Sequence, residues 1–576
     1  MPRIPSVTAF LKPDNGYEPT EAEQRLITAC QKGEHCILSN ERPTGPTEAN
    51  TIRAELIRLL ILGGTKDCGL DDSGVGLKGG WIRGILDLRF AKGQGGLTLA
   101  ECYFQNAPYL EHARLDQLNL DGSKLPGLRA SHLELSGALF LEGTEMTGPL
   151  SLVGARIGGQ LNCVGAKLDD NGGVALNGQG MTLGDSLFLR AAKVRGCITL
   201  AGSQIGGQVV CVEAELDGNG GKALNGQGMT LGQSLFLRGV TATGCIGLNG
   251  SRIGGQLACE GAKLDGNGSM ALNGQNMRVT GGLFFRKVEK VVGGVSLASA
   301  HAGDLADDFE SWGKISGTLD LAGFTYDRLF GSLDIPGRLR WLKQGAWFDG
   351  TFSPQPYTQL AKTLAAMGHN RAARRVLYER EEILGQEQLR EDRKRLSELW
   401  RDSRGEGAAA QEVRADIGVH WCRMRFSQVK HWLARRIVGH GYLPERALIV
   451  SLKVLTMATL GYFIVWRAGG MVPNSDVVMT SAQWAQAMAE NPAAPAHAWE
   501  HLGAGQHYET FNAFAYAADV FVPLFDLGQE SAWAATTANF LGTMAWGAKW
   551  LLQGMGWLVS ALGVAAITGI MQKDRD

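Results

Sequence analysis

The feature that most constrains the fold is an internal repeat with a period of about 48 residues. Similar segments begin at Ile157, Ile205 and Ile253, and close variants of "LDGNGGKALNGQ" occupy 168–179, 216–227 and 264–275. A weaker copy begins at Leu135. A fixed period of this length indicates stacked units that share one continuous core.

Shorter units lie inside each repeat. Apolar pairs such as Leu161/Cys163 and Leu187/Leu189 recur about every 11 residues, with one step near 15. Their alternation is typical of strands with one buried face, and strands of about three to five residues bury a core only when stacked. The sequence therefore predicts a mainly β protein, a right-handed β-solenoid over 81–335. About ten coils, from Ile85 to Phe324, would make a rod about 50 Å long.

The lengthened step could be a calcium loop, a phosphate cradle or a turn. It offers one reliable carboxylate, Asp217, whereas Asn219, Asn225 and the glycines suit left-handed turns. We interpret it as a bulged corner that recurs every second coil. The bulges should then align as a solenoid edge available for binding, formed by Asp169, Asn171, Asp217, Asn219, Asp265 and Asn267.

Two other residue types form columns. Cys163, Cys211 and Cys259 recur at the repeat period, as do Cys197 and Cys245. We interpret them as buried apolar residues in a reducing compartment, with redox cysteines as the alternative. Arg190, Arg238 and Arg286 form either a solvated outer face or an anion-binding ladder.

Both ends of a solenoid require caps, because open strand edges invite pairing. Residues 1–80 should contain a helical cap at 51–64, with Ile52, Leu56, Leu59 and Leu60 at helical spacing. Residues 336–410 should form a helical hairpin at 354–384 and a charged helix to about Arg404, with a hinge at 403–411.

Two C-terminal segments, 447–466 and 551–571, are long and apolar enough to span a membrane. The alternative is buried helices of a soluble domain. Basic residues crowd 411–446, whereas 468–548 contain acids but no Lys or Arg. The two segments predict a two-helix transmembrane domain at 447–576. Because basic residues remain on the cytoplasmic side, we expect an acidic external loop, and a solenoid and both termini in the cytoplasm.

The stretch 508–533 could be a re-entrant pore segment or an interfacial helix. In the first case Asp519, Asp526 and Glu530 are candidate pore residues. Small residues Ala561, Ala565 and Gly569 permit close helix packing. Two spans alone make a poor membrane domain, so we expect a homo-oligomer.

Candidate chemistry is sparse. The "HAWEH" segment places His497, Glu500 and His501 in an inverted zinc-peptidase pattern, with the two histidines on one helix face. The loop around them is too small for a peptidase fold. No dinucleotide fingerprint, phosphate loop, nucleophile elbow or CxxC pair occurs, and the net charge of −1 suggests no nucleic-acid partner. We therefore expect no cofactor, and no catalytic motif supports an enzymatic function.

The quoted features together resemble a bacterial family of pentapeptide-like β-solenoid membrane proteins. The resemblance rests on "IRAELIRLLILGG", the "GGQLxCxGAxL" repeats, "PQPYxQLAxxLxxMGHxxxARRVL" and "VFVPLFDLGQESAW". Members are often labelled "membrane-associated oxidoreductase", but the resemblance brings no catalytic residues to this chain. It implies a protein of the bacterial inner membrane.

The sequence thus predicts a membrane-anchored cytoplasmic platform for binding or sensing, with the bilayer and an unknown protein or ligand as partners. It could be an oligomeric ion channel or pore-type effector. The alternatives are a static membrane scaffold and, as the family label says, a redox enzyme.

Overall fold

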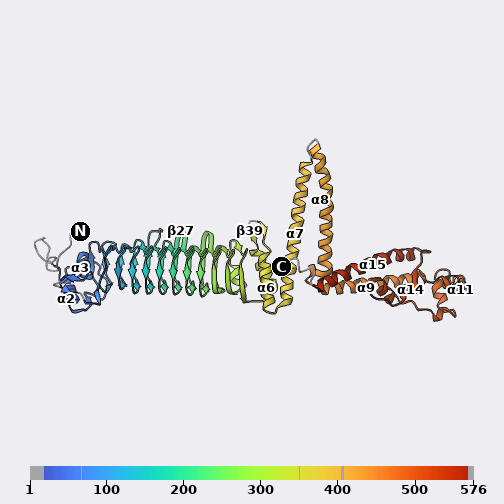
Figure 1. The fold of residues 1–576 in the computed structure, drawn as a ribbon, viewed down its shortest axis with the longest axis horizontal. Coiled ribbons are helices and arrows are strands. Elements are labelled where there is room, and N and C mark those ends of the chain that lie inside the picture. The colour runs from blue at the N-terminus through green and yellow to red at the C-terminus, as the bar shows by residue number, and fades with distance from the viewer. Residues whose placement is uncertain (1–18, 66–67, 70, 349, 404–407, 569–576) are drawn as a thin grey trace. The chain divides into compact units, whose positions relative to one another are not determined.

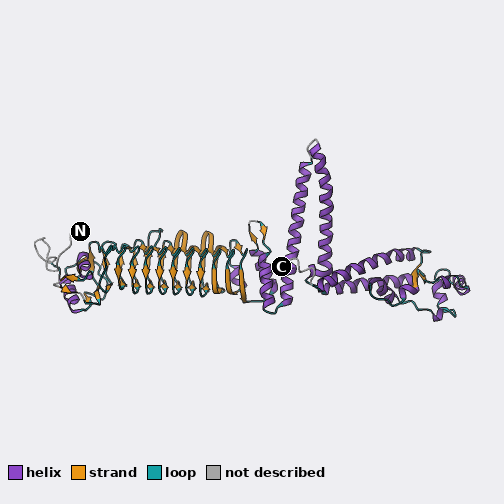
Figure 2. Ribbon diagram, viewed as in Figure 1, coloured by secondary structure: helices purple, strands orange, loops and turns teal. Residues whose placement is uncertain are grey.

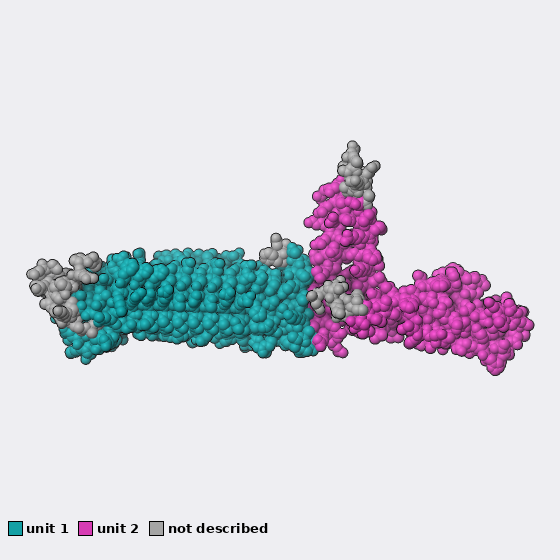
Figure 3. All heavy atoms as spheres, viewed as in Figure 1, with its two compact units in different colours: residues 1–369 teal, residues 370–576 magenta. Residues whose placement is uncertain are grey.

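A computed structural model describes residues 19–65, 68–69, 71–348, 350–403 and 408–568. It divides into two compact units, residues 1–369 and residues 370–576 (Figure 3). The first unit contains the solenoid and its caps. The second contains two long helices and the apolar helices with their connecting loop.

The first unit is a β-solenoid of about 12 turns (Figures 1 and 2). A regular turn contains four short strands, and each strand pairs in parallel with its counterpart in the next turn. One set of ladders contains β1 (Cys36–Ile37), β5 (Gly74–Lys78), β7 (Gly96–Ala100), β9 (Arg114–Leu115), β10 (Leu118–Asn119), β13 (Glu134–Leu135), β14 (Leu139–Phe140), β17 (Arg156–Ile157), β18 (Leu161–Asn162), β21 (Thr182–Leu183), β22 (Leu187–Phe188), β25 (Gln204–Ile205), β26 (Val209–Val210), β28 (Thr230–Leu231), β29 (Leu235–Phe236), β31 (Arg252–Ile253), β32 (Leu257–Ala258), β34 (Arg278–Phe285), β36 (His301–Asp307) and β38 (Thr325–Phe330). The other contains β2 (Thr51–Arg53), β6 (Trp81–Arg83), β8 (Tyr103–Phe104), β11 (Lys124–Leu125), β12 (Leu128–Arg129), β15 (Glu145–Met146), β16 (Leu150–Ser151), β19 (Lys167–Asp169), β20 (Leu176–Asn177), β23 (Lys193–Arg195), β24 (Ile198–Thr199), β27 (Glu215–Asn225), β30 (Thr241–Gly247), β33 (Lys263–Asn273), β35 (Lys290–Ser296) and β37 (Leu319–Asp320).

The repeat period appears directly in the strand register. Leu161 pairs with Leu187, and Leu187 pairs with Val209, so the first step along the chain is longer than the second. One long and one short turn therefore make up one period of the repeat. The side chains of this column are fully buried, so the core of the rod is a stack of aliphatic layers.

The solenoid is longer than the expected ten coils because its ladder extends beyond the recognisable repeats. Cys36 pairs with Leu77, so pairing begins well before Ile85. At this end, α2 (Glu21–Lys32) and α3 (Ala54–Ile61) form the helical cap, with a small hairpin of β3 (Gly64–Thr65) and β4 (Cys68–Gly69). The prediction was wrong for Ile52, which lies on β2 beside Ile82 and not on the helix.

The other end is covered by α4 (Phe309–Gly313), α5 (Ile335–Gly345), a hairpin of β39 (Trp347–Phe348) and β40 (Thr351–Phe352), and α6 (Gln355–Ala366). The side chain of Gln359 on α6 donates to the backbone carbonyl of Tyr326 on the last strand. These caps cover the strand edge that an open solenoid would expose.

The second unit begins with α7 (Asn370–Asp402) and α8 (Ala408–Leu433), which lie side by side (Figure 1). The charged helix expected after the hairpin is continuous with it in α7. Residues 404–407, inside the predicted hinge, and residues 1–18 and 569–576 lie outside the described residues. The remaining elements are η2 (Ala434–Val438), η3 (Gly439–Gly441), α9 (Glu445–Arg467), β41 (Met471–Pro473), α10 (Asp476–Met479), α11 (Ala482–Glu490), α12 (Pro495–Trp499), η4 (Gly505–His507), α13 (Ala513–Phe521), α14 (Gln529–Ala532), β42 (Trp533–Ala535) and α15 (Phe540–Ile567).

Candidate functional site

Two helices, α9 and α15, are long and apolar enough to cross a membrane. Only 11% of the most apolar stretch of α9 and 28% of that of α15 are buried in the protein. The core helix of a soluble domain would be mostly buried, so this exposure argues against that alternative. The second helix begins at Phe540, well before the predicted start at 551.

The face of α15 turned into the protein carries Leu552, Gly556 and Val559. Ala561 is exposed and Ala565 half-buried, while Gly569 lies outside the described residues. The described part of the predicted small-residue stripe therefore lies mostly off the intramolecular packing face. The exposed side of this stripe is therefore accessible to a second copy of the chain.

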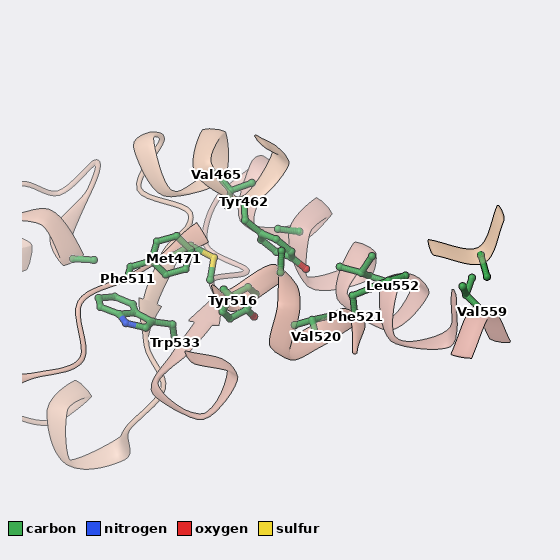
Figure 4. Packing of buried hydrophobic residues seen from close by; sticks show 14 of the residues in the cluster. Tyr462, Val465, Met471, Phe511, Tyr516, Val520, Phe521, Trp533, Leu552 and Val559 are labelled. Atoms are coloured by element: carbon green, nitrogen blue, oxygen red, sulfur yellow. The ribbon is translucent and has the colours of Figure 1, made fainter. Parts of the chain in front are cut away.

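Helix α13 lies along the two apolar helices (Figure 4). Tyr516 packs edge-on against Tyr462 of α9, with ring centroids 4.7 Å apart. At the end of α13, the carbonyl of Phe521 lies so close to Gly556 of α15 that a Cβ there would overlap it. Gly556 lies in the middle part of α15, so α13 does not merely cross the helix ends. Whether 508–533 is re-entrant or interfacial stays a prediction.

Aromatic side chains join the end of α9 to the loop that connects the apolar helices. Trp466 stacks on Phe511 at 4.9 Å and meets Trp533 edge-on at 5.1 Å. Trp533 is fully buried and begins β42, which pairs with β41. The loop between the apolar helices is therefore a small folded layer with its own core.

The candidate pore acids have different surroundings. Asp519 is buried, and its carboxylate accepts backbone N–H groups of Leu527, Gln529 and Glu530. Glu530 forms a 2.8 Å ion pair with Lys549 of α15. Asp526 is exposed and accepts the N–H of Gly528. Asp519 and Glu530 thus have partners within the fold, and a pore role for the three acids stays a prediction.

The "HAWEH" residues do not share a helix face as expected, because α12 ends at Trp499. His497 donates from Nε2 to the carbonyl of Trp466 at 2.9 Å, whereas His501 is exposed. Burial raises the pKa of Glu500. Among the described residues, the one group of three side chains with possible metal-ligand atoms within 4.8 Å of one another lies elsewhere.

A basic pocket of about 670 Å³ lies where α8 and η2 meet the beginning of α9. It is lined by Tyr378, Trp432, Arg435, Arg436, Arg446, Ile449, Val450 and Lys453. Its lining contains four cationic side chains and no acidic one. In the sequence, these cations indicate only on which side of the membrane the segment lies. Tyr378 lies on α7, far earlier in the chain, so only the packing of the helices brings it next to these cations.

Arg446 shows how the pocket is held together. Its guanidinium lies over the ring of Tyr378 at 4.8 Å, donates to the hydroxyl of that tyrosine, and donates to the carbonyl of Arg435. Two cationic side chains of the lining, Arg436 and Lys453, have no ion pair among the described residues. The cations can bind an anionic group, and Trp432 and Ile449 can contact an apolar part of the same ligand, so the pocket is suited to an amphipathic anion.

On the solenoid, the lengthened steps form aligned bulges (Figure 2). Asn171, Asn219 and Asn267 have φ near +50°, and each donates its backbone N–H to the Asp two positions earlier, Asp169, Asp217 or Asp265. The side chain of Asn219 lies against Gly172 of the preceding bulge, so successive bulges stack. Binding at this edge stays a prediction.

Asn225 does not adopt the left-handed conformation expected of it. It lies on β27, where it pairs with Thr199, and its amide donates to the hydroxyl of that threonine. The bulge needs a left-handed residue only where the chain reverses, which is at Asn219 and Gly220.

The arginine column is partly neutralised. Arg238 and Arg286 both contact Glu260, which lies in the turn between them, at 2.9 and 3.2 Å, while Arg190 is exposed. Interleaved acids weaken the field that an anion ladder needs. This arrangement favours the interpretation as a solvated face.

The cysteine columns face inward. Cys163, Cys211 and Cys259 are free thiols, fully buried, and burial raises the pKa of each to about 12. Cys197 and Cys245 are half-buried, and burial raises their pKa values too. A thiol kept protonated is a poor nucleophile, so the structure favours a packing role over redox chemistry.

No family model matches the chain, and no curated protein matches it.

Proposed function

We propose that this protein is a membrane-anchored platform, with the solenoid held at the cytoplasmic face of a bacterial inner membrane by α9 and α15. The observation that carries the proposal is the exposure of the most apolar parts of both helices. An apolar surface of that length is stable in hydrocarbon and costly in water. The assignment to a bacterial membrane rests on the family resemblance of the sequence.

Charge distribution supports the orientation. Residues before α9 are rich in Arg and Lys, whereas 468–548 contain neither. Basic flanks remain on the cytoplasmic side. The solenoid precedes α9 and would lie on that side, and the folded loop with β41 and β42 would lie outside.

The basic pocket supplies the second contact with the bilayer, because it takes the headgroup of an anionic phospholipid. Arg436 of η2 and Lys453 of α9 provide cations, and Ile449 and Val450 provide an apolar wall for acyl chains. Each cation near an anionic surface contributes about 1 kcal/mol.

Impermeant-maleimide labelling of intact and permeabilised cells tests the orientation. Native Cys422 on α8 is exposed and should react only after permeabilisation, whereas a Gln506→Cys variant should also react in intact cells. Reaction of Cys422 in intact cells would refute the orientation. Recovery of the whole chain in the soluble fraction would refute membrane anchoring.

Lipid binding is tested with the full-length protein in detergent and phosphatidylglycerol or phosphatidylcholine micelles. The Arg436→Ala/Lys453→Ala variant should lose most of the preference for phosphatidylglycerol. Arg423→Ala, which removes an exposed cation on α8, is the matched control and should retain it. Equal loss in both variants would show only a general effect of charge.

An oligomeric ion channel is a second candidate, favoured by the packing of α13 along both apolar helices. A homo-oligomer would bring several copies of the exposed Asp526 around one axis. Conductance in planar bilayers should then depend on Asp526, with Asp476→Asn as the control because Asp476 also lies in the loop, at the start of α10. Absence of conductance, or crosslinking that yields only monomers, would leave the static scaffold.

A further inference from the structure

Three side chains with metal-ligand chemistry converge in the second unit. Glu382 lies on α7, His431 on α8 and His440 in η3. One ligand atom from each lies within 4.8 Å of the other two, and all three side chains are at least four-fifths buried. They come from three different elements, so no short sequence motif predicts that they lie together.

The backbone is shaped to bring them together. Gly385 lies one turn after Glu382, and a Cβ at 385 would overlap the ring of His431, so glycine admits that ring between the helices. After His431, α8 widens into the π-helical turn η2, and Gly439 and His440 then both take left-handed backbone conformations, with φ of 54° and 57°. That conformation costs a residue other than glycine about 1 kcal/mol, and such positions concentrate at functional sites.

Two buried polar atoms of the cluster, one on Glu382 and one on His431, lack a hydrogen-bond partner among the residues that the structure describes. Glu382 Oε2 and His431 Nε2 are buried, and within the described part of the chain neither has a hydrogen-bond partner. A buried polar atom in that condition costs about 1–3 kcal/mol. Arg435 compensates the other oxygen of Glu382 at 3.0 Å. A cation among the three side chains would satisfy both orphaned atoms at once.

We propose that Glu382, His431 and His440 bind one divalent transition-metal ion, with Zn²⁺ the best match. Two imidazole nitrogens and one carboxylate oxygen form a donor set that suits zinc, whereas Mg²⁺ and Ca²⁺ prefer oxygen alone. Ligand atoms around tetrahedral zinc are about 3.3 Å apart. His431 Nε2 lies 3.8 Å from Glu382 Oε1, and His440 Nε2 lies 3.8 Å from Glu382 Oε2, so side-chain rotations have to bring both nitrogens to one oxygen around the ion.

The ion would fasten α7, α8 and the 439–441 turn to one another. That turn shortly precedes α9, so metal binding would stiffen the joint at the start of the first apolar helix. The inference goes beyond the proposed anchoring, because neither the apolar helices nor the basic pocket requires a metal. The three ligands leave a fourth position for water.

Metal content and equilibrium dialysis of full-length protein in detergent, first stripped with a chelator, test the site. The wild type should rebind one Zn²⁺ per chain, and Glu382→Gln and His440→Ala should each weaken binding at least tenfold. His369→Ala removes an exposed histidine that belongs to neither histidine group and is the matched control. Unchanged binding in the two site variants, or no stoichiometric binding by the wild type, overturns the proposal.

Replacing Zn²⁺ with Co²⁺ tests the site in the wild-type protein, so the result does not depend on whether a site variant folds. Co²⁺ in the wild-type protein should show visible bands of a four- or five-coordinate nitrogen–oxygen site. A sulfur-to-metal band would indicate a cysteine ligand and overturn the assignment. Bound Zn²⁺ should also raise the melting temperature of the helical signal, because it binds only the folded site. Cell fractionation measures membrane anchoring separately, so failure of metal binding and failure of anchoring can be distinguished.

Discussion

Single residues decide how the end of the solenoid is closed. Asp307 and Arg338 form a bidentate ion pair, at 2.6 and 2.7 Å, with both side chains fully buried. Trp312 donates its indole N–H to the same carboxylate. Since a buried charge needs a partner, this pair links the last turns to α5, and removal of one member should cost far more than removal of a surface pair.

The Arg338→Ala variant should lose about 3–5 kcal/mol of stability, because it leaves Asp307 buried without its cation. The matched control is Arg328→Ala, which breaks the largely exposed pair with Asp304 and should cost less than about 1 kcal/mol. Urea titration of the strand circular-dichroism signal measures both. Similar losses in the two variants would contradict the role given to the buried pair.

At the scale of elements, glycine sets the spacing between turns. The 79 glycines of the chain include a continuous ladder in which a Cβ on each member would overlap a backbone carbonyl of the preceding turn. The ladder runs through Gly158, Gly184, Gly206, Gly232 and Gly254. Gly158, Gly206 and Gly254 are the first glycines of the "GGQ" segments of the repeats, and Gly184 and Gly232 take the same position in the turns between them, so glycine is a packing requirement of this corner. The repetition of these glycines is visible in the sequence, whereas the carbonyl that each one contacts is visible only in the fold.

A Gly206→Ala substitution should destabilise the solenoid by about 1–3 kcal/mol, because its methyl group has to push two turns apart. Gly221→Ala is the control: it lies in a bulge, where the nearest atom to a Cβ is 3.4 Å away. The urea midpoint of the strand signal should fall in the first variant only. A Gly206→Ala midpoint equal to wild type would contradict the proposed close contact.

At the scale of the whole molecule, each unit contains the caps and core that it needs. The first unit includes α6, whose side chains cover the last strand. A chain of residues 1–369 should therefore be soluble and retain the strand circular-dichroism signal, whereas 370–576 should require detergent because α9 and α15 expose apolar surface. Aggregation of the 1–369 chain on removal of the second unit would contradict this division.

The sequence by itself determined the features that are periodic or contiguous. The internal repeat was enough to predict the solenoid and its bulged corners, and two long apolar stretches were enough to predict α9 and most of α15. The inward-facing Cys163 followed from its register. Such features depend on neighbours in sequence or on copies at a fixed spacing, which a single chain displays directly.

Only the tertiary structure decided what depends on contacts between unlike, distant segments. The turns beyond the repeats, the burial of Asp519 and the convergence of Glu382 with His431 and His440 have no local signature. The same holds for the basic pocket, where Tyr378 meets cations far along the chain. The physical reason is that the packing of helices determines which of their faces are in contact. That packing depends on all the elements of the unit and not on any single stretch of sequence.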